Sequence, residues 1–307
     1  MAGATAALLP VEIWYNIAEE LDLPDLLNLA LSCLRLGTLC SKAVDNYLKK
    51  KLRRVELGGR GRREFAAHSF LLRVLRGQFP PSYIEELDCD EDYWNDEDLE
   101  DLENMIEHYR KQFPFYEKMP LTPADNDLIR RAVNDSPWIY ESEVEDYIYQ
   151  VRLGNEGAVF CILLPLLTEL RLLSLPTDPG RLEIIAARIA AAATVGPRTT
   201  ALPLSRLLLV MARAENGNYY GISLESMAPF AALLSVRRLI VMAGRNEGFE
   251  GWPVGLPLSR ASEVFFVDST ITKSAVRGFA AGFAGPCIIR QWFSDCGSRF
   301  RPDEGHT

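Results

Sequence analysis

Residues 8–36 read LLPVEIWYNIAEELDLPDLLNLALSCLRL, and this apolar stretch decides the fold of the N-terminal region. Pro10 pre-sets the backbone of a first helical turn, and Glu12 lies where the helix macrodipole favours an acidic residue. A helix over residues 10–20 is therefore predicted. At about 100° per residue, its apolar stripe consists of Pro10, Ile13, Ile17 and Leu21, with Trp14 beside them.

Two further helices are predicted directly behind the first. Asp22 and Pro24 mark the start of a helix that runs to about residue 33, and a third helix covers residues 38–51. The second helix carries apolar residues over more than the roughly 100° arc of an ordinary surface helix. Three short helices are only marginally stable by themselves. The surplus apolar surface of the second helix is therefore covered either by the rest of the chain or by a partner.

The order and spacing of these residues resemble the F-box motif, whose general form is LPxEIxxxIxxxLxxxDLLxLxxxCxxxxxL. The residues that match it without a gap are Leu9, Pro10, Glu12, Ile13, Ile17, Leu21, Asp25, Leu26, Leu27, Leu29, Cys33 and Leu39. The chain departs from the motif at residues 35–37, where Arg-Leu-Gly replaces the usual arginine or aromatic pattern of the last helix. The resemblance implies that residues 1–50 dock on a Skp-type adaptor and, through it, on a cullin RING ubiquitin ligase. It assigns the adaptor contact to Leu9, Pro10, Ile13, Ile17, Leu21, Leu26 and Leu29.

Short apolar segments of the form LxxLxL recur behind this module. They begin at Leu164 (running on to Leu172), Leu204, Val236 and Ala261, with a degenerate copy around Ile289 and two weaker copies at residues 52–57 and 84–89. The anchors at 170, 207, 239, 264 and 289 are 37, 32, 25 and 25 residues apart. The last two intervals lie within the roughly 20 to 29 residue period of leucine-rich repeats.

Helix signals lie between these strands. Helices are predicted from Asp178-Pro179 to about Thr194, from Ser223 to about Leu234, from Thr272 to about Ala281, and over residues 64–75. The predicted fold is therefore an α+β repeat: a three-helix F-box-like module followed by an irregular leucine-rich-repeat-like α/β solenoid over residues 51–300, with a tail at 301–307. An open α/β sheet would give a similar alternation and remains the alternative.

The predicted target-binding strip follows from period-two alternation within the LxxLxL strands. Because the anchors point inward, the residue between the last two anchors faces outward. These positions are Arg171, Leu208, Ile240, Phe265 and Arg290. Exposed apolar residues flanked by arginines favour a protein-binding surface, although a loop such as residues 216–221 could instead cover it.

The acidity of the chain belongs to one segment. The formal net charge is −9, and residues 85–107 contain thirteen acidic residues with no Lys or Arg, which leaves the rest of the chain at +4. We interpret this segment as a solvated insertion between repeats, and recruitment of a basic partner is the alternative. A calcium loop is excluded, because Tyr93 and Leu99 occupy the positions that need glycine and a bidentate glutamate.

No catalytic constellation stands out in the sequence. His68, His108 and His306 have no cysteine or paired carboxylate at ligand spacing, and the six cysteines form no CxxC pair. Residues 49–54, KKKLRR, are interpreted as cations that complement a helix C-terminus; a nuclear-import or nucleic-acid patch is the alternative. We therefore expect a non-enzymatic, intracellular protein, cytoplasmic or nuclear, with no cofactor, no metal and no membrane span.

An F-box followed by irregular leucine-rich strands also resembles the large set of fungal F-box proteins. The resemblance implies a substrate-recognition subunit of a Skp–cullin–F-box ubiquitin ligase, with the adaptor on the N-terminal helices and a target protein on the solenoid. The alternative is an interaction scaffold in which the N-terminal helices only cap the solenoid.

Overall fold

The computed structural model describes residues 9–21, 23–32, 34–57, 67–89, 121–153, 155–175, 179–195, 203–213, 221–246 and 249–293. The chain divides into two compact units, Met1–Val55 and Glu56–Thr307. The boundary predicted from the sequence lies at residue 50, and the two units are described separately below.

Unit 1 contains the helices α1 (Val11–Glu20), α2 (Leu23–Ser32) and α3 (Leu34–Leu52). All three were predicted, and α3 begins four residues earlier than the predicted start at Thr38. Its core is small: Ala18, Leu26 and Cys40 are buried, and partly buried residues such as Tyr47 pack around them. Each helix therefore contributes one side chain to the centre of the unit.

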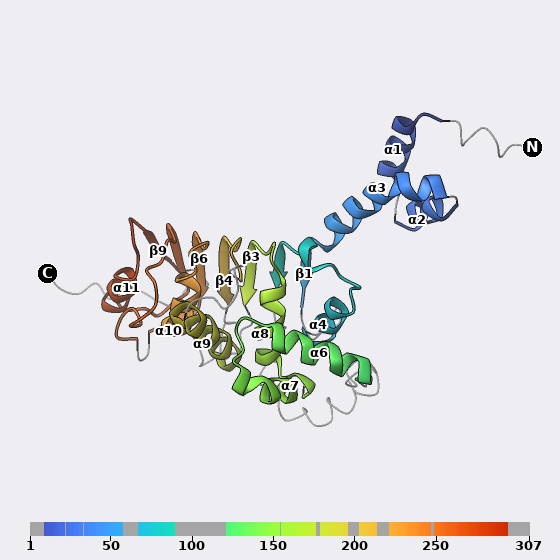
Figure 1. Cartoon of the computed structure of the whole chain (residues 1–307). Coiled ribbons are helices and arrows are strands. Elements are labelled where there is room, and N and C mark those ends of the chain that lie inside the picture. The colour runs from blue at the N-terminus through green and yellow to red at the C-terminus, as the bar shows by residue number, and fades with distance from the viewer. Residues whose placement is uncertain are drawn as a thin grey trace, which may run out of the picture. The chain divides into compact units, whose positions relative to one another are not determined.

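Unit 2 is organised by a seven-stranded sheet (Figure 1). Its strands are β1 (Arg54–Glu56), β2 (Glu86–Asp88), β3 (Leu172–Leu175), β4 (Leu209–Arg213), β6 (Arg238–Met242), β8 (Glu263–Val267) and β9 (Ile288–Trp292). The order in the sheet is the order in the chain, and the pairs from β2 to β9 are all parallel. A doubly wound sheet would reverse its strand order, and the described strands show no reversal.

Register places one buried residue of each central strand in a single row. Leu87 pairs with Leu173, Leu173 with Val210, Val210 with Leu239, and Leu239 with Val264. All five side chains are fully buried. The row continues to Ile289 in β9, which is only half-buried because no described strand lies beyond it.

The helices of unit 2 lie along one side of the row of strands (Figure 1). They are α4 (Ala67–Leu75), α6 (Pro123–Asp135), α7 (Val144–Arg152), α8 (Glu156–Leu166), α9 (Pro179–Val195), α10 (Leu224–Ala231) and α11 (Lys273–Ala280), with 3-10 turns at Pro81–Tyr83 and Glu141–Glu143. A second, two-stranded sheet joins β5 (Ile222–Ser223) to β7 (Gly244–Arg245). Ser223 and Thr272 cap α10 and α11 by accepting backbone hydrogen bonds, as their positions in the sequence predict.

The segment from Leu164 to Leu172 is not one strand, and that prediction is wrong. Residues 156–166 form α8, and β3 begins only at Leu172. Nearly all of α8 is buried, so it is apolar on every side, and such a helix cannot be told from a buried strand by periodicity. Its start is nevertheless signalled by Asn155, whose side chain accepts a hydrogen bond from the Ala158 backbone N–H.

The acidic segment also needs a correction at its start. Residues 86–88 form β2, with Leu87 in the core, so the insertion begins after this strand and not at Glu85. Residues 90–120 lie outside the described residues. The chain returns at α6, whose N-terminus has a capping box between Thr122 and Asp125 that the sequence analysis missed.

One ion pair fixes this returning helix to the rest of unit 2. Arg76 donates from Nε to Asp125 Oδ1 and from Nη2 to Asp125 Oδ2, both at 2.8 Å. The Asp125 side chain is 3% exposed and that of Arg76 is 25% exposed. Asp125 also accepts hydrogen bonds from the Thr122 backbone and hydroxyl. The carboxylate therefore joins the end of α4 to the start of α6.

Replacement of the Asp125 carboxylate tests whether the ion pair with Arg76 stabilises the contact between α4 and α6. Asp125→Asn removes the charge from a bidentate, mostly buried pair, and we expect a loss of about 2 to 4 kcal/mol in the free energy of unfolding. Urea titration followed by circular dichroism measures it. Glu145→Gln is the matched control, since the Arg130–Glu145 pair is exposed and its loss should change little. Equal effects of the two substitutions would contradict this role for Asp125.

Because of the same ion pair, the free energy of unfolding should depend on pH in the acidic range. Hydrogen bonds from Arg76, followed by those from Thr122, hold the pKa of the Asp125 carboxyl well below its usual range. In the unfolded chain Asp125 has a pKa of about 3.9. The ion pair therefore stabilises the folded state fully above this pH, and the stabilisation is lost as the pH falls further. We expect the wild type to lose more stability than Asp125→Asn between about pH 5 and pH 2. If the free energy of unfolding fell equally with pH in the wild type and in Asp125→Asn, the prediction would be wrong.

Candidate protein-docking surfaces

Helix α1 buries only part of its apolar surface within the structure. Trp14 and Ala18 are 7% and 3% exposed. At about 100° per residue, two apolar pairs flank this buried stripe on the helical wheel. The first pair is Ile13 and Ile17, at 42% and 36% exposure, and the second is Val11 and Tyr15, at 36% and 38%. The apolar arc of α1 is therefore wider than the face that unit 1 covers.

The predicted adaptor-contact residues fall into different environments. Pro10, Ile13 and Ile17 are exposed, whereas Leu9, Leu21 and Leu29 are half-buried. Leu26 is 1% exposed and belongs to the core of unit 1. A buried side chain cannot contact a partner without rearrangement, so Leu26 holds the helices together in this structure.

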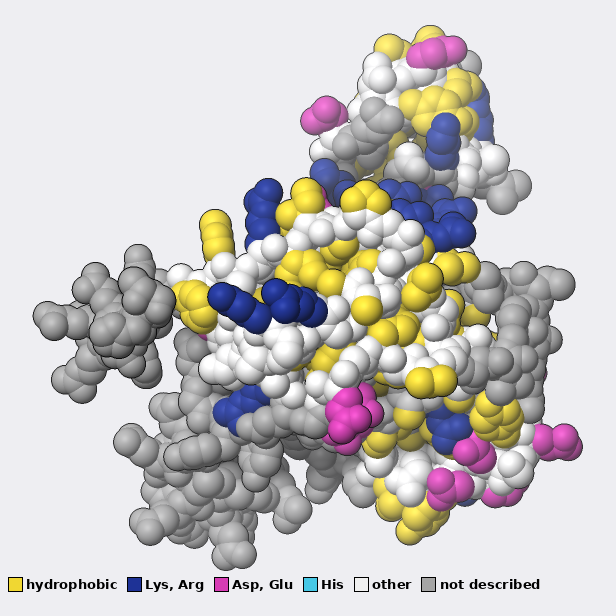
Figure 2. All heavy atoms as spheres, turned by 90° about the vertical axis from the view of Figure 1, so that its left-hand side faces the viewer, with side chains coloured by type: hydrophobic (Ala, Val, Ile, Leu, Met, Phe, Trp, Pro, Cys, Tyr) yellow, Lys and Arg dark blue, Asp and Glu magenta, His cyan; other side chains and the backbone are white. Residues whose placement is uncertain are grey.

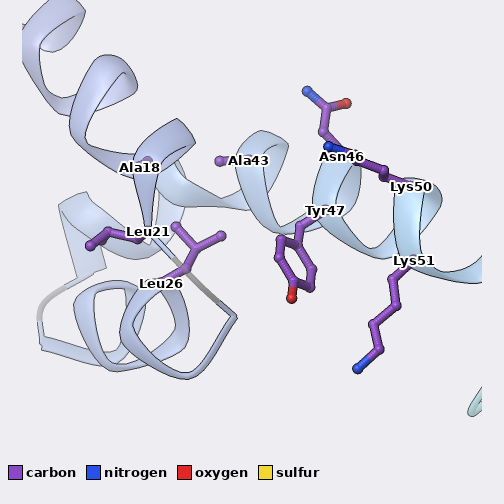
Figure 3. A pocket seen from close by; sticks show the side chains of 8 residues that line it. All are labelled: Ala18, Leu21, Leu26, Ala43, Asn46, Tyr47, Lys50 and Lys51. Carbon is purple, nitrogen blue, oxygen red and sulfur yellow. The ribbon is translucent and has the colours of Figure 1, made fainter.

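A pocket of about 560 Å³ opens beside this core. Ala18, Leu21, Leu26 and Ala43 form its apolar part, and Asn46, Tyr47, Lys50 and Lys51 add polar groups from α3. Figure 3 shows Tyr47 and Lys51 projecting to one side of α3, and Asn46 and Lys50 to the other. This lining suits an apolar side chain with a carboxylate nearby.

The outward face of the sheet carries the second candidate surface. Ile240, Phe265 and Arg290 occupy adjacent positions in one register row across β6, β8 and β9, as predicted. Arg171 and Leu208 are exposed but lie before β3 and β4, outside this row. The row instead continues through Met211 in β4, which is half-buried, and Ser174 in β3, which is buried and adds nothing to the accessible surface.

For β3 and β4 the prediction is wrong because it assigned the LxxLxL pattern to the wrong residues. We call this assignment of the buried anchors the frame of the strand. In β4 the buried anchors are Leu207, Val210 and Ala212, so the outward residue between the last two is Met211. The prediction set the frame three residues earlier, at Leu204, which is buried as well. In β3 the buried residues Leu170, Leu173 and Leu175 likewise define the frame, and they place Ser174 in the row.

Aromatic and cationic side chains gather at the β9 end of this face. The guanidinium carbon of Arg290 lies 5.9 Å from the centre of the Phe265 ring, and that of Arg238 lies 6.0 Å from it. Arg238 also donates to Glu263 at 2.5 Å. Trp292, whose side chain is 71% exposed, is the last residue of β9, the strand that contains Arg290. This chemistry is typical of protein-binding surfaces, in which arginine and aromatic residues are enriched.

Within the described ranges, no three His, Cys, Asp or Glu side chains come together as metal ligands. Burial raises the pKa of Cys161 to about 12 and also raises that of Cys89, so both thiols are protonated at neutral pH. His68 is half-buried in α4, and His108 and His306 lie outside the described residues.

No helix in the described ranges combines the length and the apolar character needed to cross a bilayer. Comparison with known proteins adds no identity: no family model, no curated protein and no solved structure matches this chain.

The different burial of Leu26 and Ile13 gives a direct test of which residues are available for docking. Leu26→Asp places a charge in the core of unit 1, and we expect a loss of more than about 4 kcal/mol, enough to unfold these helices. Ile13→Asp should leave them folded, because the site is already 42% exposed. Limited proteolysis of the full chain measures both, and cleavage of both variants within α1–α3 would show that Ile13 is also structural.

Proposed function

We propose that the chain is the substrate-recognition subunit of a Skp–cullin–F-box type ubiquitin ligase in fungal cells. Unit 1 binds a Skp-type adaptor, and the outward face of the unit 2 sheet binds a target protein. The chain itself catalyses nothing and needs no cofactor. It accelerates ubiquitin transfer by holding the target close to an enzyme elsewhere in the complex.

One observation carries the adaptor part of the proposal: α1 leaves Ile13 and Ile17 exposed beside the Trp14 and Ala18 stripe that unit 1 buries. Both residues occupy positions of the F-box-like motif. Surfaces of this kind on a small helical unit usually mark an interaction site. The pocket is lined in part by Leu21 and Leu26, which are further positions of the same motif.

The architecture of unit 2 supports an irregular leucine-rich-repeat-like solenoid as the target-binding part. Its parallel strands follow one another in chain order, and a row of buried residues runs through them. The described helices lie along one side of the strands, and we assign target recognition to the other side (Figure 1). Solenoids use such extended strand faces for binding.

The adaptor contact is tested by a double substitution on α1. Ile13→Asp combined with Ile17→Asp replaces two apolar contacts with charges, and we expect adaptor affinity to fall at least about 100-fold. Binding of the purified full chain to an immobilised Skp-type adaptor gives the measurement. Asn16→Asp is the matched control, because it adds a charge on the polar side of the same helix. Unchanged binding by the double variant would refute the proposal.

A deletion separates this proposal from a scaffold whose N-terminal helices only cap the sheet. Removal of residues 1–50 retains β1, so the sheet keeps all its strands. A docking module should leave the thermal unfolding of unit 2 nearly unchanged while adaptor binding is lost. Unfolding of the truncated chain would favour the scaffold.

A further inference from the structure

The outer edge of β9 has unpaired backbone groups. On its inner side β9 pairs with β8 along its whole length, and no described strand lies on its outer side. The Ile288 N–H donates to the Ser262 carbonyl, and the Trp292 carbonyl accepts from the Asp268 N–H. Because backbone groups alternate in direction along a strand, those of Ile289 and Gln291 point to the outer edge. This edge is a template for another strand.

The side chains of β9 are unusual for an edge. Ile288 and Trp292 are 52% and 71% exposed, Arg290 lies between them on the same face, and Phe293 follows at 70%. Sheet edges are commonly protected by proline, charged side chains, a bulge or a very short strand; β9 has five residues without proline, and Arg290 is its one charged residue. Figure 2 views unit 2 from this end and shows hydrophobic side chains next to basic ones.

This exposure does not come from a poorly packed end of the sheet. Phe279 of α11 is fully buried beneath β8. The ring centres of Phe249, Trp252, Phe266 and Phe283 lie 5.6–6.2 Å from its own. A Cβ at Gly282 would overlap the Trp252 ring, so glycine permits this contact. The helix side of the last strands is thus a closed aromatic core, and the exposed residues belong to the other side and to the edge.

Charge indicates what the edge binds. Arg290 and Arg238 both lie over the Phe265 ring, but the carboxylate of Glu263 is already bonded to Arg238. No carboxylate of the described residues pairs with Arg290. With respect to the described carboxylates, the Arg290 guanidinium can therefore pair with an anionic group that binds beside β9.

We infer that β9 binds an extended segment of a partner protein by strand addition. The segment carries an acidic residue beside Arg290 and apolar residues two positions before and after it, beside Ile288 and Trp292. Backbone hydrogen bonds to Ile289 and Gln291 provide the alignment, and the alternate side chains provide specificity. This inference names the target class of the proposed receptor and rests on that function, and its test needs no adaptor, so the two can fail separately.

The charge requirement is tested with two labelled seven-residue peptides and the full chain. Both have valine and phenylalanine flanking the central residue at alternate positions, and the central residue is glutamate in one and lysine in the other. By fluorescence anisotropy we expect the glutamate peptide to bind at least about tenfold more tightly. Arg290→Glu should reverse this preference. Equal affinity of both peptides, or no binding of either, would overturn the inference.

The use of the edge is tested by removing one backbone donor. Gln291→Pro deletes an N–H that points away from β8, so the existing sheet keeps its hydrogen bonds. We expect at least about tenfold weaker binding of the glutamate peptide. Gln291→Ala is the control, because it also loses the side-chain bond to the Ser269 carbonyl but keeps the N–H. Equal binding by both variants would overturn the role of the edge.

A peptide with methylated backbone amides gives a second measurement if the proline variant does not fold. It keeps its side chains but cannot pair with an edge, and we expect no binding to the wild type. Undiminished binding would overturn strand addition. The competing occupant of the edge is a second copy of this chain, and sedimentation of the free protein detects it. If the protein forms dimers that Gln291→Pro dissociates, and if no peptide binds, self-association replaces the inference.

Discussion

The structure of unit 2 depends on one constraint: each parallel strand must bury one side chain in the same row against the helices. Leu87, Leu173, Val210, Leu239 and Val264 satisfy it. Because side chains alternate along a strand, this row also fixes which residues face outward. A shift of the strand frame by one residue would exchange the two faces. The outward surface is therefore determined by the packing behind it.

The sequence predicts the elements of this array better than their frame. Ser223 and Thr272 were identified as helix starts because a hydroxyl before a helix satisfies a free backbone N–H. The frame of β6 and β8 was also predicted, since each has one set of anchors. It failed for β4, where Leu204 and Leu207 are both buried and the pattern fits twice. Only the tertiary contacts distinguish the two frames.

The candidate site in unit 1 shows a related limit. Leu26 and Ile13 are both apolar positions of one motif, yet one is 1% and the other 42% exposed. A helical wheel gives the direction of a side chain but not the neighbour that covers it, because three short helices bury only part of an apolar arc. The motif thus predicted the helices and a candidate surface, and the coordinates separate core residues from accessible ones.

The outward face of the sheet and the β9 edge share one physical origin: the described helices of unit 2 lie along one side of the strands. Repeated strands bury their inner faces against helices and pair with their neighbours, so a chain of them always has a last edge. At the first edge, β1 has only three residues, and a strand so short offers little to a further strand. At the last edge, β9 keeps five residues, and Trp292 and Ile288 remain exposed. The cost of this exposed apolar edge is explained if a partner covers it, and Arg290 gives the charge that such a partner must match.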